Sequence, residues 1–179
     1  MKAALPPLAI VGAAIPLLAL SACDKPKPRP AAAAAATAAA QAGAPALTPA
    51  ASTGLAKRAE MAGFSLDLIN EAQDPLNRPA TIRTGVPVTV SGFGFDPVAQ
   101  TAGKAIDIVI DGAAYGTTYG HERSDVAAYY KTEAVLKSGF RTTLPAGTVK
   151  AGPHKILVRV VAADGKSYFD SATIDFYAQ

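Results

Sequence analysis

The stretch KILVRVVAADGKSYFDSATIDFY, residues 155–177, decides the fold. Apolar side chains take alternate positions in it, at Ile156, Val158, Val160 and Ala162 and again at Ala172, Ile174 and Phe176. A two-residue period with one apolar face predicts β-strands that turn this face toward a shared core. Asp164-Gly165 lies between the two runs and predicts a hairpin with a type I′ turn, whose two central residues need a positive φ.

The same alternation recurs earlier in the chain, in residues 64–68, 86–91 and 106–111. Asp111-Gly112 predicts a second hairpin, and Pro87 predicts a strand that lies at a sheet edge or begins at this residue. About seven such strands within residues 63–179 predict an all-β fold, an immunoglobulin-like β-sandwich with one short helical turn. The chain has no Trp and a single Cys. The large core positions therefore fall to phenylalanines: Phe64, Phe93, Phe95, Phe140 and Phe176.

Residues 1–22 have the composition of a secretory signal peptide. Lys2 supplies a positive charge, an apolar stretch runs to Leu20, and two small residues precede Cys23. A permanent transmembrane helix is the alternative, because the apolar stretch is about 18 residues long. The three prolines within this stretch disfavour that alternative, since each removes a backbone donor and kinks a helix.

Leu20-Ser21-Ala22-Cys23 resembles the lipobox of bacterial lipoproteins. The resemblance implies that the thiol of Cys23 carries a diacylglycerol and that the chain is cut before this residue. It also implies a lipid anchor in a membrane of the bacterial cell envelope, with the domain facing the periplasm or the exterior. Asp24 resembles a signal for retention in the inner membrane, which favours this membrane over the outer one. An ordinary signal peptide with a chance cysteine is the alternative, and beyond the covalent lipid we expect no cofactor.

Residues 23–62 are rich in Pro and Ala and show no apolar periodicity. This composition predicts a disordered, flexible linker, although Thr53 as a cap and Gly63 as a terminator predict a short helix at its end. Residues 23–59 carry a charge of +4, whereas residues 60–179 carry eleven bases against thirteen acids, a net charge of −2. The basic excess therefore belongs to the linker, and we expect no nucleic-acid partner for the domain.

Residues 118–130 interrupt the strand pattern and hold the densest polar cluster of the domain. They predict a loop followed by a short helical turn that Ser124 or Asp125 caps. The candidate binding residues lie in and beside this segment: Tyr115, Tyr119, His121, Arg123, Asp125, Tyr129 and Tyr130. Tyrosine presents a flat apolar face and a polar tip to sugars or protein partners. Alternatively, two or more tyrosines plug one end of the sandwich, and Arg123 locks the loop by bridging carboxylates.

A second resemblance covers roughly residues 86–170. The motifs that carry it are, in order, GFGFD (92–96), IVIDG (108–112), ERSDVA (122–127) and SGFR (138–141). Their order is similar to that in Ig-like modules of bacterial surface and exported proteins. The chain departs from those modules at Phe93, where they have Trp, and at Ser124, where they have Pro. The resemblance implies a sandwich that acts as a spacer or binds sugars or other proteins.

These observations predict a membrane-anchored lipoprotein whose domain is not an enzyme and binds an envelope protein or glycan. Two alternatives stay open: a small cell-envelope hydrolase with His121 as base and Ser124 as nucleophile, and a passive spacer. Catalytic groups are usually assembled from separated segments, and the sequence lacks a Gly-x-Ser-x-Gly or phosphate-binding motif. His121 and His154 are the only histidines and lie far apart in sequence, so we expect no metal site.

Overall fold

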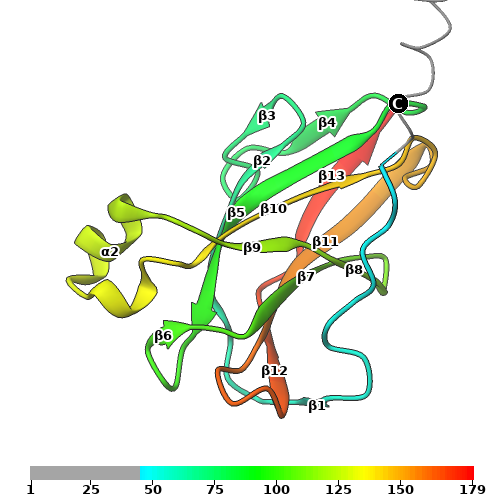
Figure 1. Ribbon diagram of the computed structural model, residues 1–179. Helices are drawn as coiled ribbons and strands as arrows, with labels where there is room; N and C mark the ends of the chain where they lie inside the picture. The colour runs from blue at the N-terminus through cyan, green and yellow to red at the C-terminus, as the bar shows by residue number, and fades with distance from the viewer. Residues whose placement is uncertain (1–44) are drawn as a thin grey trace, which may run out of the picture. The chain divides into compact units, whose positions relative to one another are not determined.

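Two β-sheets pack face to face in the computed structural model, which describes residues 45–179 (Figure 1). One sheet has seven strands and the other has six, and a short helix, α2 (Ser124–Tyr130), lies beside them. The predicted all-β sandwich with one short helical turn is confirmed. The predicted signal peptide, Cys23 and most of the predicted linker lie outside the described residues. Within residues 45–179, no helix is both long and apolar enough to cross a membrane.

The seven-stranded sheet is built around its longest strand, β11. Its members are β1 (Ala56–Lys57), β4 (Ala80–Ile82), β7 (Ala105–Ile110), β8 (Ala113–Gly116), β11 (Gly152–Val161), β12 (Ser167–Asp170) and β13 (Ile174–Ala178). β11 pairs antiparallel with β7 along one side and with β13 and then β12 along the other. Every second side chain of β11 and β7 is therefore directed into the sandwich.

The six-stranded sheet is built around β5. Its members are β2 (Gly63–Ile69), β3 (Ala72–Gln73), β5 (Val88–Asp96), β6 (Thr101–Ala102), β9 (Thr118–His121) and β10 (Gly139–Leu144). β5 lies between β2 and β10 and pairs antiparallel with both. It begins directly after Pro87, which confirms the predicted start and satisfies the rule that proline cannot donate within a central strand.

The core is made of the alternating apolar residues that the sequence indicates. Leu66, Ile108 and Val158 are fully buried and come from both sheets. Of the predicted aromatic core residues, Phe140 and Phe176 lie in this core, and Phe95 lies in a smaller second cluster. Phe64 and Phe93 are only partly buried. Phe169 is fully buried but was not predicted, because its strand β12 is too short to show an alternating pattern.

The two predicted hairpins both form, but their turns differ. Asp111 and Gly112 have φ of 49° and 88°, as a type I′ turn requires, and Ile110 pairs with Ala113 across it. In the second hairpin only Gly165 has a positive φ, of 71°. The Ala162 N–H donates to the Ser167 carbonyl across a wider loop. A hairpin therefore forms at Asp164-Gly165, but it joins β11 to β12 instead of to β13, the strand that contains the second alternating run, and the prediction of a type I′ turn there is wrong.

Residues 48–57, which we call the strap, correct the predicted linker. The sequence predicts a flexible linker through residue 62 with a short helix near its end, whereas the strap contains β1, which pairs parallel with β12. The Asp107 carboxylate accepts hydrogen bonds from the Ala51 and Ser52 N–H groups at 2.9 and 2.8 Å. The Gly116 N–H donates to the Thr48 carbonyl at 2.9 Å. Hydrogen bonds to residues distant in sequence therefore hold the strap on the sheet, although its composition has no pattern of apolar residues.

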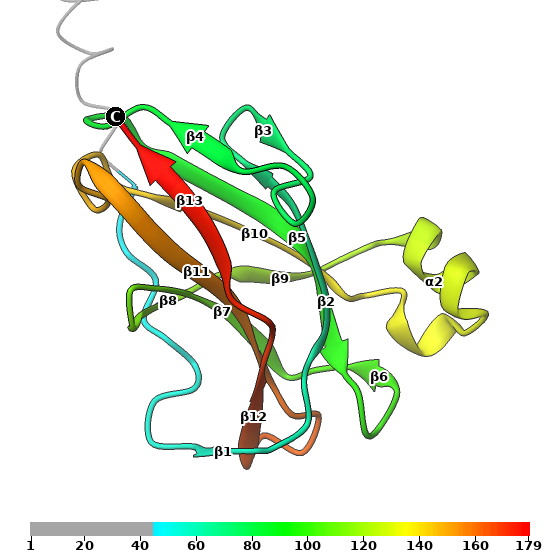
Figure 2. The ribbon, with the colours of Figure 1, turned by 180° about the vertical axis from the view of Figure 1, so that it is seen from behind.

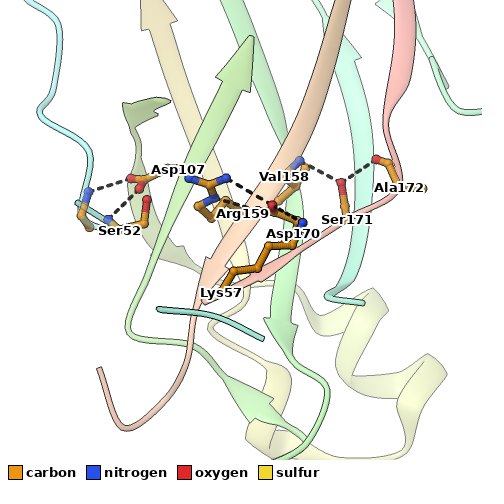
Figure 3. A network of polar contacts seen from close by, with 9 residues as sticks. Ser52, Lys57, Asp107, Val158, Arg159, Asp170, Ser171 and Ala172 are labelled. Atoms are coloured by element: carbon orange, nitrogen blue, oxygen red, sulfur yellow. Dashed lines mark hydrogen bonds and ion pairs between the residues drawn. The ribbon is translucent and has the colours of Figure 1, made fainter. Parts of the chain in front are cut away.

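A polar network continues from the strap across the outer face of the seven-stranded sheet (Figure 3). Arg159 lies opposite Asp107 on one neighbouring strand and opposite Asp170 on the other. Its guanidinium donates to Asp170 at 2.7 Å, and the Lys57 ammonium of β1 lies 3.0 Å from the same carboxylate. Burial raises the pKa of Asp170, but hydrogen bonds from Arg159 and Lys57 outweigh it and leave the pKa below its usual range.

The described chain begins and ends at the same end of the sandwich. Figures 1 and 2 place the start of the coloured ribbon, at residue 45, beside the C-terminus and the tips of β4 and β13. The backbone agrees, because the Thr84 N–H, just after β4, donates to the Gln179 carbonyl. We call this the entry end. The helix α2 lies away from it in both views.

Candidate binding site

The connection between β9 and β10 leaves the sheet and builds the candidate site. It contains α2 and a 3-10 turn, η1 (Glu133–Val135). Residues 118–121, predicted to be a loop, instead form β9, because they pair with β10. The predicted caps are also wrong: Ser124 is the first helical residue, and the cap position is Arg123, which makes no side-chain cap hydrogen bond. The helix ends at Lys131, whose φ of 54° is left-handed.

A second hydrophobic cluster fixes this connection to β5. Val126 of α2 and Val135 of η1 pack against Phe95, and all three are buried. Phe93 lies two residues before Phe95 on the same face of β5, and their rings stack with centroids 6.4 Å apart. The period of two along β5 thus supplies a pair of aromatic rings that hold a helix too short to be stable alone.

Arg123 ties the helix to the six-stranded sheet. Its guanidinium donates to Asp67 of β2 at 2.7 Å and to both carboxylate oxygens of Asp125, at 2.9 and 2.7 Å. It also lies over the Phe93 ring, 5.2 Å from the centroid. The hydrogen bond from Arg123 lowers the pKa of Asp125 to about 2. The prediction that Arg123 bridges carboxylates is confirmed, although Asp67 comes from a strand 56 residues away.

The aromatic pocket opens between α2 and the outer face of this sheet. It has a volume of about 390 Å³ and is lined by Ser65, Phe93, Asp125, Val126, Tyr129 and Tyr130. The Tyr130 ring packs edge to face against the rings of Phe95 and Tyr129, with centroid distances of 4.8 and 5.0 Å. Tyr129 is 79% exposed. An exposed aromatic side chain with fixed neighbours can stack on a ligand ring or pack against an apolar side chain.

The other two candidate tyrosines are structural. Tyr115 packs against the main core. The Tyr119 hydroxyl donates to the Gly94 carbonyl at 2.8 Å and accepts from the Gly103 N–H at 2.9 Å. Burial raises the pKa of Tyr119 to about 12. Tyr115 and Tyr119 thus pack into the sandwich, which favours the plug alternative for these two residues, whereas Tyr129 and Tyr130 line the aromatic pocket.

His121 and Ser124 do not meet. Both are exposed, His121 on the edge strand β9 and Ser124 at the start of α2, and within residues 45–179 their side chains form no hydrogen bond with each other. Glu122 pairs with Lys137 at 2.6 Å, which lowers the pKa of Glu122. The same described residues hold no group of three His, Cys, Asp or Glu side chains placed to bind a metal ion. This geometry gives the hydrolase alternative no support.

Sequence reasoning missed the part of the site that comes from the strands. Ser65 and Phe93 lie opposite each other on β2 and β5, and Asp67 lies one period further along β2. Phe93 was predicted as a core residue, yet it is only partly buried and lines the pocket. The sequence signal for this part of the site is Phe93-Gly94-Phe95. Its two aromatic residues lie on one face of the strand, and the neighbouring Val88 and Val90 place the main core on the other face.

Comparisons with known proteins add little to this geometry. No protein-family model and no curated protein matches the chain. Among solved structures, the X-ray structure of the endo-β-1,4-mannanase from Thermotoga petrophila is similar with a TM-score of 0.39 and 12% sequence identity. The match covers 71% of this chain and 21% of that chain.

Proposed function

We propose that this protein is a lipid-anchored binding protein of the bacterial cell envelope, whose sandwich presents the aromatic pocket to a protein or glycan partner. The lipobox-like Leu20-Ser21-Ala22-Cys23 supports the anchor. The signal peptide supports export, and Asp24 favours the inner membrane. Two acyl chains hold a protein firmly at a bilayer, so the anchor would keep the domain at the envelope without a membrane-spanning helix.

The exposure of Tyr129 is the observation that carries the binding function. The residue is 79% exposed, and its ring lies in an edge-to-face contact with Tyr130, which in turn contacts Phe95. A preorganised aromatic side chain loses little conformational entropy when a partner packs against it. Beside it, the Asp125 carboxylate accepts hydrogen bonds, and Arg123 keeps it ionised. This combination of a flat apolar face and a charged acceptor suits a sugar ring or a protein side chain.

Binding is tested with the chain from Cys23 to Gln179, immobilised through its single cysteine. Envelope proteins and a panel of envelope glycans are applied, and dissociation constants are measured for whatever binds. We expect Tyr129→Ala to weaken binding at least about tenfold, which corresponds to about 1.4 kcal/mol. Tyr177→Ala is the matched control, because Tyr177 is also exposed but lies on β13. Equal binding by wild type and Tyr129→Ala would contradict the pocket assignment, and no bound partner would favour a passive spacer.

The anchor is tested separately by mass spectrometry of the mature amino terminus. We expect Cys23 to be the first residue and to carry a diacylglyceryl thioether, with a further acyl chain on its amine. Cys23→Ser removes the thiol that the lipid needs, so this variant should keep its signal peptide or leave the membrane fraction. An unmodified terminus at another residue would contradict the anchor but not the binding site.

A further inference from the structure

The six arginines of the described chain fall into two groups. Three of them form an ion pair with a carboxylate and also lie over an aromatic ring: Arg58 with Glu60 and Phe169, Arg123 with Asp67, Asp125 and Phe93, and Arg159 with Asp170 and Tyr168. Within residues 45–179, the other three have no carboxylate oxygen within 4.0 Å: Arg78, Arg83 and Arg141. The fold thus satisfies half of its guanidinium groups internally and leaves the rest to solvent or to a partner.

Two of the unpaired arginines line one groove. Arg83 follows β4, Arg141 lies on β10, and the groove between them has a volume of about 800 Å³. Its floor and rim include the apolar residues Leu68, Val86 and Pro87, and Val86 is 40% exposed. Glu71 is the only carboxylate among the lining residues. We call this the arginine groove; it combines a net positive charge with an exposed aliphatic side chain and has no aromatic ring for a sugar to stack on.

The arginine groove lies toward the entry end of the sandwich. The Thr84 N–H, next to Arg83, donates to the Gln179 carbonyl, and residue 45 lies at the same end (Figures 1 and 2). The loop after β10 carries Lys150 at this end too, because Leu144 of β10 pairs with Val88 of β5. The 21 residues 24–44 separate Cys23 from residue 45, and that length spans at most roughly 75 Å. A lipid on Cys23 would therefore keep the entry end, where this segment joins the domain, within this distance of the bilayer.

We propose that the arginine groove docks on the phosphate groups of anionic phospholipids and holds the domain with its entry end on the membrane. This proposal rests on the lipid anchor of the proposed function. Guanidinium groups pair well with phosphate oxygens, and Val86 supplies an apolar side chain for the headgroup boundary. The domain as a whole is slightly acidic, with a net charge of −2 over residues 60–179, so an anionic surface attracts this end and repels the remainder.

Weak contacts suffice for such docking, because the anchor already holds the domain at the membrane and docking becomes an intramolecular step. Each basic side chain at an anionic surface is expected to favour the docked state about fivefold, and tethering supplies an effective concentration in the millimolar range. Docking would leave the aromatic pocket further from the bilayer than the arginine groove. Phe93 lies four residues further along β5 than Thr89 of the groove, a distance of about 13 Å along the strand.

The test captures the chain from Cys23 to Gln179 on vesicles through a maleimide lipid that couples to its only thiol. This coupling replaces natural acylation, so the docking result does not depend on whether Cys23 is lipidated in cells. Amide hydrogen exchange is measured on phosphatidylcholine vesicles with and without phosphatidylglycerol. We expect exchange in residues 83–89 to slow at least about fivefold when phosphatidylglycerol is present, and residues 97–103 at the opposite end of β5 to stay unchanged. Salt at about 1 M should remove the effect, because it shortens the Debye length to about 3 Å.

The double variant Arg83→Gln and Arg141→Gln should lose this protection. Arg78→Gln is the matched control, because Arg78 is an exposed, unpaired arginine that does not line the groove. Equal exchange on both kinds of vesicle, or an equal loss of protection in Arg78→Gln, would overturn the proposal. Soluble glycerol phosphate is added to the chain without vesicles in a further arm. Slowed exchange in that arm, together with no additional effect of vesicles, would assign the groove to a free anion and overturn the membrane as its source.

Discussion

The outer faces of the two sheets differ in how their polar groups are satisfied. On the seven-stranded sheet, Asp107 is completely buried because the strap covers it, and Arg159 and Asp170 complete a network within the chain (Figure 3). On the six-stranded sheet, Arg123 joins two carboxylates, but the aromatic pocket and the arginine groove beside it remain open. The polar network on the first face is satisfied by its own chain, although a hollow of about 320 Å³ lies beside it, whereas the second face leaves the aromatic pocket and the arginine groove available to partners.

This difference separates stability from function. Where the chain supplies every partner of a buried charge, removing one partner leaves the others unsatisfied and lowers stability. Where side chains are left exposed in a fixed arrangement, changing them costs little stability and acts on binding. Mutations on the two faces should therefore produce effects of different kinds as well as different sizes.

The largest effect is expected on the covered face. Asp107→Ala removes the acceptor for the Ala51 and Ser52 N–H groups and the negative charge opposite Arg159. We expect the free energy of unfolding to fall by about 2–5 kcal/mol, measured by urea denaturation. Hydrogen exchange should show faster exchange along the strap. Asp175→Ala is the control: this exposed carboxylate pairs with Lys155, and its loss should cost less than about 1 kcal/mol. Equal losses in the two variants would contradict the structural role of the strap.

A smaller effect is expected at Tyr119, which joins the edge of the open sheet to the interior. Tyr119→Phe leaves the Gly94 carbonyl and the Gly103 N–H without this partner, which should cost about 1–2 kcal/mol. Because burial raises the pKa of Tyr119 from 10.0 to about 12, its hydroxyl contributes fully below pH 10. That contribution is lost as the pH rises toward 12.

Absorbance titration checks this prediction. A tyrosine transition near pH 12 should be present in the wild type and should vanish in Tyr119→Phe. Tyr129→Phe is the control, because Tyr129 is exposed and its hydroxyl forms no hydrogen bond within residues 45–179. If Tyr129→Phe removed this transition instead, the division of the tyrosines into plug and pocket would be wrong.

Local patterns in the sequence predict the sandwich but not what covers it. The alternation at Ile106, Ile108 and Ile110 predicts which face of β7 is buried, and it also placed Asp107 on the opposite face. No local pattern indicates that Asp107 is buried, because its hydrogen-bond partners lie 55 and 56 residues earlier in a segment with the composition of a linker. Long-range pairing of this kind has no local signature.

The candidate site can be predicted only in part, because some of its residues come from strands that are distant in sequence. The polar and aromatic segment around Arg123, Tyr129 and Tyr130 stands out in the sequence, and it does line the pocket or support it. Its partners on β2 and β5 follow from strand register, which a single sequence does not determine. Arg83 lies in no motif, and the SGFR motif that ends at Arg141 points to the fold and not to a site; only the arrangement of the strands brings the two arginines to one groove.

The smallest expected effect is on the open face, at the ion pair between Arg123 and Asp125. Asp125 is mostly exposed, with 66% of its side chain accessible, so we expect this pair itself to contribute less than about 1 kcal/mol; Arg123→Gln also removes the hydrogen bond to Asp67. Its signature is a titration. The hydrogen bond from Arg123 holds the pKa of Asp125 at about 2 rather than 3.8. The pair therefore stabilises the fold above pH 3.8 and loses its contribution as the pH falls through 2.

In Arg123→Gln, the Asp125 pKa measured by NMR should return toward 3.8, while the pKa of Glu60 stays low because its own partner is Arg58. If Asp125 still titrated near pH 2 in this variant, a group other than Arg123 would have to hold it. An unchanged pKa of Asp125 would also mean that other groups of the chain satisfy the polar side chains of the open face, as they do on the covered face. In that case the aromatic pocket would lose the charged acceptor that supports its assignment to a partner.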